Sequence, residues 1–117
     1  MSNYLLACVL AIVLHELAHI TLAYACGLRV KRVGISRIGP YLVREQGSAA
    51  VNVCVTLAGP IANLVLAVAF LHTAPLFAEV NLLLGAYNLL PFIPHTDGRR
   101  AWSVLRATER MTIPVKN

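Results

Sequence analysis

The sequence predicts an all-α membrane protein with three transmembrane helices and a small interfacial β-hairpin between the first and the second. Of its 117 residues, 58% are hydrophobic and 13% are charged, whereas a soluble domain has roughly 45–50% apolar and about 25% charged residues. A chain of this length has room for one domain and for three or four crossings of about 20 residues each. We therefore expect a single membrane-embedded domain over residues 1–117 and not a water-soluble globule.

The expected spans cover residues 4–26, 49–71 and 76–93. The first has only three ionisable side chains and is long enough to cross about 30 Å of hydrocarbon at about 1.5 Å per residue. A cleaved signal peptide is disfavoured, because no basic residue precedes this stretch. The second span has no charged residue, and the third is short and broken by proline.

Two basic segments follow the first and the third span. In residues 27–48 apolar residues alternate with basic ones, and glycines and a proline discourage a helix, which predicts the hairpin. Residues 98–117 are expected to form an interfacial tail anchored by Trp102. These segments hold all ten Lys and Arg residues, and this asymmetry places both in the cytoplasm and the N-terminus outside, in a bacterial cell membrane. Because topology explains the charge excess, no nucleic-acid partner is expected.

One motif in the first span carries chemistry. His15-Glu16-Leu17-Ala18-His19 is HExxH, and on a helix the two imidazoles lie one turn apart on one face, where both can hold a Zn²⁺ ion. Zinc lowers the pKa of a bound water to about 7, and Glu16 can accept its proton, which is the chemistry of peptide hydrolysis. Ionisable residues within a span are costly and point to function, although a polar cluster that only joins helices is the alternative.

Catalytic zinc usually has three protein ligands, so a third must come from elsewhere in the chain. Other acidic and histidine residues fall at the outer boundary or in basic cytoplasmic segments, which leaves His95 and Asp97. Both follow a stretch in which Pro91 and Pro94 break the helix at membrane depth, where irregular backbone must be buried in protein or line a cavity. Asp97 is the favoured third ligand, and His95 is the alternative.

The second and third spans each carry a stripe of amides and small residues. The stripes are Asn52, Thr56, Gly59 and Asn63 in one, and Asn81, Gly85 and Asn88 in the other. Such residues commonly join membrane helices. For Asn63 a catalytic role is the second possibility, in which its amide binds the substrate backbone or stabilises an oxyanion.

The motifs HELAH, LAGPIAN and NLLPFIPHTDG, in this order over about residues 10–100, resemble the site-2 protease family of intramembrane zinc metalloproteases, especially its compact bacterial sporulation-type members. The resemblance implies a three-helix metalloprotease core and one zinc ion per chain. It assigns His15, His19 and Asp97 as zinc ligands, Glu16 as catalytic base, and Asn63 and Asn88 as supporting residues. One departure concerns the last motif: five residues separate its proline from Asp97 where the family has four, and Arg99 replaces a second glycine.

The expected function is hydrolysis of a peptide bond in or near a transmembrane segment of a membrane protein substrate. The alternative hypothesis, from a different class of function, is that the chain is a catalytically inactive relative that binds or retains transmembrane partners. The additional residue before Asp97 is the observation behind this hypothesis. A homo-oligomer or a regulatory membrane partner is a further expectation.

Overall fold

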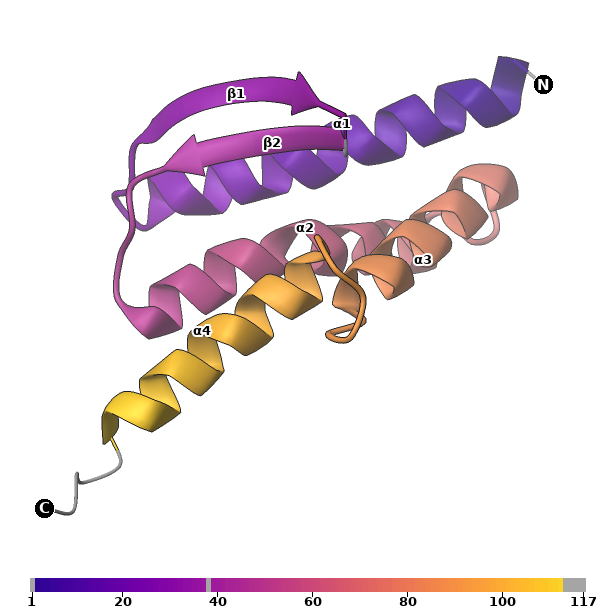
Figure 1. Cartoon of the computed structure of the whole chain (residues 1–117). Coiled ribbons are helices and arrows are strands. Elements are labelled where there is room, and N and C mark those ends of the chain that lie inside the picture. The colour runs from indigo at the N-terminus through magenta and orange to yellow at the C-terminus, as the bar shows by residue number, and fades with distance from the viewer. Residues whose placement is uncertain (1, 38, 113–117) are drawn as a thin grey trace, which may run out of the picture.

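The computed structural model describes residues 2–37 and 39–112 as four helices and one two-stranded sheet (Figure 1). The elements are α1 (Ser2–Ala25), β1 (Val30–Ser36), β2 (Gly39–Arg44), α2 (Ala49–Ala69), α3 (Pro75–Leu89) and α4 (Asp97–Thr112). A mostly helical chain with a small hairpin between the first two long helices is thereby confirmed. The end of the expected tail, residues 113–117, lies outside the described residues, as do residues 1 and 38.

Two helices are long and apolar enough to cross a membrane. They comprise Asn3–Ala25 in α1 and Ala49–Ala69 in α2, and only 22% and 28% of their most apolar windows are buried. Most large apolar side chains of α1, such as Leu5, are exposed, and in α2 the exposed ones are Ile61, Val65 and Val68. These helices therefore present wide apolar faces outward, unlike the core helix of a soluble protein.

A third span over residues 76–93 is not confirmed. α3 has 15 residues and ends at Leu89, which gives a length of about 22 Å at 1.5 Å per residue, less than the roughly 30 Å of a bilayer core. The helix stops because a residue before proline is driven out of the helical region. Accordingly, Leu90 before Pro91 has an extended backbone, with φ −72° and ψ 112°.

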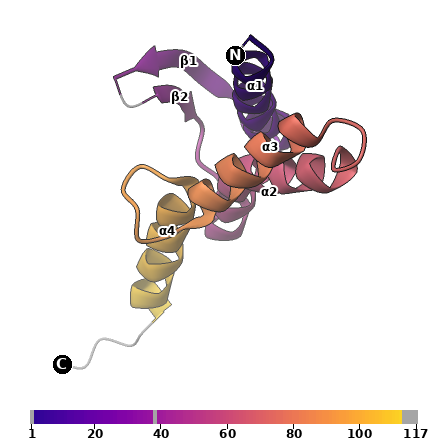
Figure 2. The ribbon, with the colours of Figure 1, turned by 90° about the vertical axis from the view of Figure 1, so that its right-hand side faces the viewer.

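α2 is the central helix and contacts α1, α3 and α4 (Figure 2). Two apolar clusters hold α1 in place along its length. Ala7 and Ala11 pack against Val80 of α3, while Ala23 packs against Val55 of α2 together with Leu28. The turns of α1 between these clusters carry the HExxH motif, so apolar packing holds α1 against α3 before the motif and against α2 after it.

The hairpin lies alongside α1 (Figure 1), and its antiparallel strands place Gly34 opposite Tyr41. A Cβ at Gly34 would lie only 2.5–2.7 Å from atoms of the Tyr41 side chain. The Tyr41 ring can therefore pack over residue 34 only because this residue has no side chain. The guanidinium of Arg32 lies 5.8 Å from the centre of the same ring. Glycine and arginine therefore fix the position of Tyr41 on the sheet.

Candidate metal centre

Three buried side chains converge where α1 meets the beginning of α4. The Nε2 atoms of His15 and His19 are 3.2 Å apart, and Asp97 Oδ2 lies 2.9 Å from the first and 3.1 Å from the second. The relative exposures of the three residues are 5%, 7% and 3%. The structure thus brings together the residues that the HExxH motif and the Asp-Gly pair singled out, as a group that could hold a metal ion.

The loop before α4 sets the position of Asp97. The Thr96 hydroxyl lies 2.8 Å from the Leu90 carbonyl oxygen and accepts a hydrogen bond from the backbone N–H of Arg99 at 3.2 Å, which is the pattern of a helix N-cap. A Cβ on Gly98 would overlap the carbonyl of Leu89. Glycine therefore lets the first turn of α4 pack directly on the end of α3, which places the preceding carboxylate at the imidazoles.

His95 takes up the additional residue of this loop. Its φ of 67° lies in the left-handed region, which is uncommon for residues other than glycine and more accessible to histidine than to most. The chain reverses there, and Asp97 reaches the imidazoles although one more residue precedes it. The His95 side chain is exposed and lines a cavity, so Asp97 and not His95 completes the group.

The two imidazoles are oriented by acceptors on α2. His15 Nδ1 lies 2.6 Å from Asn63 Oδ1, and His19 Nδ1 lies 2.8 Å from the Val55 carbonyl oxygen. Because both partners are acceptors, each Nδ1 carries the hydrogen and each Nε2 presents a lone pair. Two nitrogen lone pairs and a carboxylate oxygen then face one another, a donor set that fits a cation such as Zn²⁺.

Asn63 lies behind His15 and not at a cavity wall. It is fully buried, and its amide N–H groups donate to Asn81 Oδ1 at 2.8 Å and to the Ala11 carbonyl oxygen at 3.3 Å. This position suits orientation of the His15 imidazole rather than contact with a substrate. The amide stripes of α2 and α3 gave the signal for Asn63 and Asn81, but not for the carbonyl of Val55, because every residue has a carbonyl.

Gly59 leaves the space that the imidazoles occupy. A Cβ at this position would overlap His19 Nε2 and would lie 2.7 Å from His15 Nε2, closer than carbon and nitrogen atoms approach without a bond. The sequence marked Gly59 only as a small residue of a helix interface. Its place in the structure shows that α2 can approach the two histidines only because residue 59 has no side chain.

Charge at the group is balanced by a neighbouring cation. Asp97 Oδ1 lies 3.3 Å from the Arg100 guanidinium, while the other carboxylate oxygen faces the imidazoles. Burial by itself would raise the pKa of Asp97, but when His15 and His19 are protonated, their hydrogen bonds and positive charge outweigh burial and hold this pKa below its usual range. The carboxylate is therefore ionised at neutral pH.

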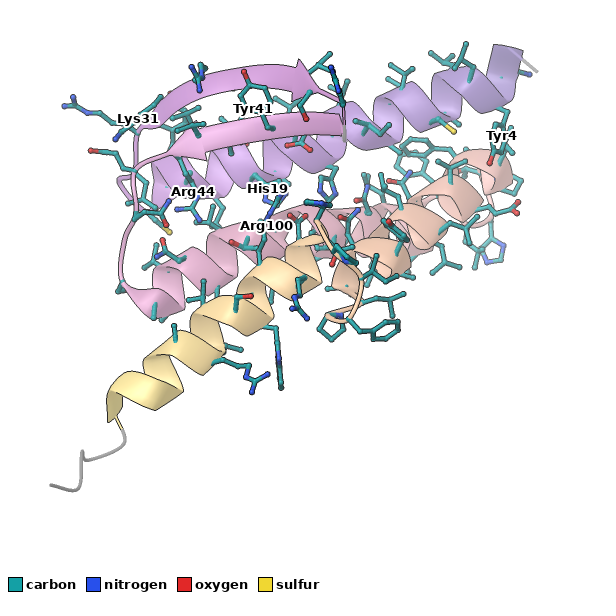
Figure 3. The ribbon with its side chains drawn as sticks, in the orientation of Figure 1. Tyr4, His19, Lys31, Tyr41, Arg44 and Arg100 are labelled. Atoms are coloured by element: carbon teal, nitrogen blue, oxygen red, sulfur yellow. The ribbon has the colours of Figure 1, made fainter. Side chains whose placement is uncertain are left out.

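Two cavities of about 360 Å³ and 240 Å³ adjoin the group. Both are lined by Glu16, Tyr41, Asp97 and Arg100, and Figure 3 shows Tyr41 on the strand that covers this region. Glu16 is half-buried and lines both cavities, the larger together with His19 and the smaller together with His15. Of the amide stripes, Asn52 and Thr56 line the larger cavity, and Asn88 lines the smaller one.

Comparisons with known proteins show what the sequence and the fold of this chain are similar to. The chain is 26% identical over 110 residues to a zinc metalloprotease of Methanocaldococcus jannaschii, an alignment that covers 83% of this chain and 31% of the relative. The fold matches the solved structure of a site-2 protease from Methanocaldococcus jannaschii with a TM-score of 0.72 and 24% sequence identity, over 92% of this chain and 54% of the other. No protein-family model matches the chain.

The resemblance to the site-2 protease family is thereby confirmed, through a sequence relation to a zinc metalloprotease and through the fold of a site-2 protease. The chain spans about a third of the length of the metalloprotease and about half of the solved chain. One of these relatives is named as a zinc metalloprotease and the other as a site-2 protease.

Proposed function

We propose that this protein is an intramembrane zinc metalloprotease, which hydrolyses a peptide bond in or near a transmembrane segment of a membrane protein substrate. The observation that carries the proposal is the convergence of His15, His19 and Asp97 at 2.9–3.2 Å beside a cavity that Glu16 lines. His15, His19 and Asp97 would hold one zinc ion. Bound zinc supplies a Lewis acid, which lowers the pKa of water and polarises the carbonyl that is attacked.

The residues of the chain divide the remaining work. Glu16 accepts a proton from the attacking water on its carboxylate and returns it to the nitrogen of the leaving amine. Asn63 and the Val55 carbonyl hold the imidazoles in one tautomer. The Arg100 guanidinium holds one oxygen of Asp97, so the other oxygen stays directed at the imidazoles.

The membrane setting belongs to the same proposal. The exposed apolar faces of α1 and α2 contact lipid, and α3 crosses as a third, short span that the loop of residues 90–96 completes. The basic hairpin and α4 lie on the cytoplasmic side of a bacterial cell membrane, and the N-terminus lies outside. The proposed partners are the substrate and the bilayer, with a second copy or a regulatory membrane protein as further partners, and no nucleic acid.

The structure removes the observation that suggested a catalytically inactive relative. That alternative rested on the additional residue before Asp97, and the left-handed backbone of His95 takes up that residue while Asp97 lies at the two imidazoles.

The experiment that tests the proposal measures bound zinc per chain in detergent-purified protein. We expect about one zinc ion in the wild type, in His95→Ala and in Glu16→Gln, and little in His15→Ala and Asp97→Ala. On a panel of fluorogenic transmembrane peptides, wild type and His95→Ala cleave, whereas Glu16→Gln does not. A folded wild type without zinc, or cleavage by Glu16→Gln at the wild-type rate, would overturn the proposal.

A further inference from the structure

The larger cavity contains two arginines, of which Arg44 has no part in the proposed reaction. Arg44 ends β2, Arg100 belongs to the first turn of α4, and both line this cavity together with Glu16, His19 and Asp97. Figure 3 shows Arg44, His19 and Arg100 in the region between β2, α2 and α4. Two guanidinium groups therefore approach the candidate metal centre from different elements.

The partners of Arg44 are neutral. Its guanidinium donates to the backbone carbonyl of Glu45 at 3.0 Å and to Asn52 Oδ1 at 3.1 Å. The Glu45 carboxylate instead accepts a hydrogen bond from the backbone N–H of Arg29 at 2.7 Å, and no ion pair joins Arg44 to another residue in the described part of the chain. Burial lowers the pKa of Arg44. A partly buried cation that makes no direct ion pair is less favourable than a paired one, and an anion at hydrogen-bond distance in the cavity would stabilise it.

Asn52 holds this arginine in position. Besides accepting from Arg44, its side chain accepts from the backbone N–H of Gly47 at 2.9 Å and donates to the carbonyl of Gly47 at 3.1 Å. Three hydrogen bonds thus clamp the segment after β2 to α2. The guanidinium is fixed before any ligand arrives, which lowers the entropic cost of binding one.

Arg100 adds a second positive group. One of its nitrogens lies 3.3 Å from Asp97 Oδ1, and since a guanidinium has five N–H donors, others are left for a ligand. In the cavity the carboxylates of Glu16 and Asp97 balance the two guanidiniums. A divalent metal ion at the imidazoles would then make the site positive overall, which favours an anionic group on whatever occupies the cavity.

We propose that Arg44 and Arg100 form a subsite for a carboxylate side chain of the peptide in the cavity, so that the enzyme selects segments with Glu or Asp close to the bond it cleaves. This inference rests on the proposed protease function. A carboxylate is the favoured anion, because its planar pair of oxygens matches a guanidinium and because the cavity adjoins the group that would hold the scissile bond.

Binding without turnover tests this subsite. Zinc-loaded Glu16→Gln protein in neutral detergent is mixed with two decapeptide libraries of random apolar residues, one with a central Glu and one with a central Gln, and the bound peptides are counted by mass spectrometry. The same measurement is made on double variants in which Glu16→Gln is combined with Arg44→Gln, Arg44→Lys or Arg100→Gln. Arg37→Gln and Arg106→Gln are the matched controls, because each removes one positive charge from an exposed residue that lines neither cavity. Zinc content is recorded for every variant.

We expect Glu peptides to be enriched about tenfold over Gln peptides, as for one charge-assisted hydrogen-bonded pair. The ratio falls to about one in Arg44→Gln, decreases in Arg100→Gln and is partly kept in Arg44→Lys, while both controls keep it. If the two libraries are recovered equally, or if neither is recovered, the subsite is overturned. It is also overturned if Arg37→Gln and Arg106→Gln lose the preference for Glu peptides as fully as Arg44→Gln does. Loss of the preference when phosphatidylglycerol is added also overturns it, because the subsite would then take a lipid headgroup.

Cleavage by the wild type separates this inference from the function on which it rests. Equal cleavage rates for Glu and Gln peptides, together with equal binding, reject the subsite and leave the protease function standing. A Glu preference in binding that depends on Arg44, without cleavage of any peptide, supports the subsite and rejects the protease function.

Discussion

The helical centre and the hairpin contrast in how their side chains are held. At the centre, Asn63, Asn81 and Thr96 are completely buried, and every buried side-chain nitrogen or oxygen of the described residues has a hydrogen-bond partner. In the hairpin, Ile35 is 86% exposed, and packing is concentrated at the base, where Val30 meets the apolar cluster of α1 and α2.

This difference separates two tasks. The centre fixes the atoms that would hold a metal, through hydrogen bonds that allow one geometry only. The hairpin supplies Tyr41 and Arg44 as walls of the cavity. We therefore expect substitutions at the centre to change metal binding, and substitutions in the hairpin to change which peptides are used.

Gly59→Ala is expected to have the largest effect. The new Cβ would occupy the space of the His15 and His19 imidazoles and displace both rings. We therefore expect the affinity for zinc to fall by at least about 100-fold. The helix itself should not be weakened, because alanine favours a helix more than glycine does. Zinc content and far-UV circular dichroism measure the two effects. Gly47→Ala is the matched control, since its Cβ would meet the Val51 side chain at 3.1 Å. One zinc per chain in Gly59→Ala would contradict the proposed position of the metal.

Asn63→Ala should weaken metal binding less, by about 10- to 100-fold, because His15 loses the acceptor that fixes its tautomer. Asn81→Ala removes the hydrogen bond from the Asn63 amide and the one to the Phe77 carbonyl but leaves the acceptor of His15 in place, so its effect should be smaller. Zinc affinity measured by competition with a chelator gives the order. If Asn81→Ala bound zinc more weakly than Asn63→Ala, the amides would affect zinc binding through helix packing and not through the orientation of the His15 imidazole.

The sequence predicted the parts of this site that depend on local spacing. Within one helix the i and i+4 positions fix how His15 and His19 lie, and the bounds of α1 and α2 followed from apolar length. The hairpin followed from the alternation of apolar and basic residues and from its glycines. The helix in the third expected span ends at Leu89, short of residue 93, because the conformational effect of Pro91 reaches back to Leu90.

Relations across the fold could not be read from the sequence. The acceptor for His19 is a backbone carbonyl of Val55, which has no sequence signal. The crowding at Gly59 appears only when α1 and α2 are docked. The register of Asp97 depended on a single residue, His95, whose left-handed backbone is one of several conformations that such a loop can adopt.

Gly34→Val tests the hairpin side of the contrast. A Cβ at residue 34 would meet the Tyr41 side chain, and since that side chain can move, the ring should leave the cavity wall without unfolding the strand. We expect unchanged zinc content and peptide cleavage reduced by about tenfold through poorer substrate positioning. Tyr41→Ala should have the same effect, and the double variant should add little to it. Loss of zinc in either variant would mean that the hairpin also shapes the metal centre.

The smallest effect is expected from His95→Gly, in the loop between α3 and α4. Glycine adopts the observed φ of 67° without the strain of about 1–2 kcal/mol that a side chain brings there, but it also makes the unfolded chain more flexible. The net result should be a gain of about 0.5 kcal/mol in the free energy of unfolding, measured by titration with a denaturing detergent. His95→Ala, which keeps the strain and removes the imidazole, should give no such gain. Both variants should keep their zinc. Loss of zinc from both would show that the His95 imidazole is a ligand. Loss of zinc from His95→Gly alone would show that a less flexible residue at this position is needed to hold Asp97 in place.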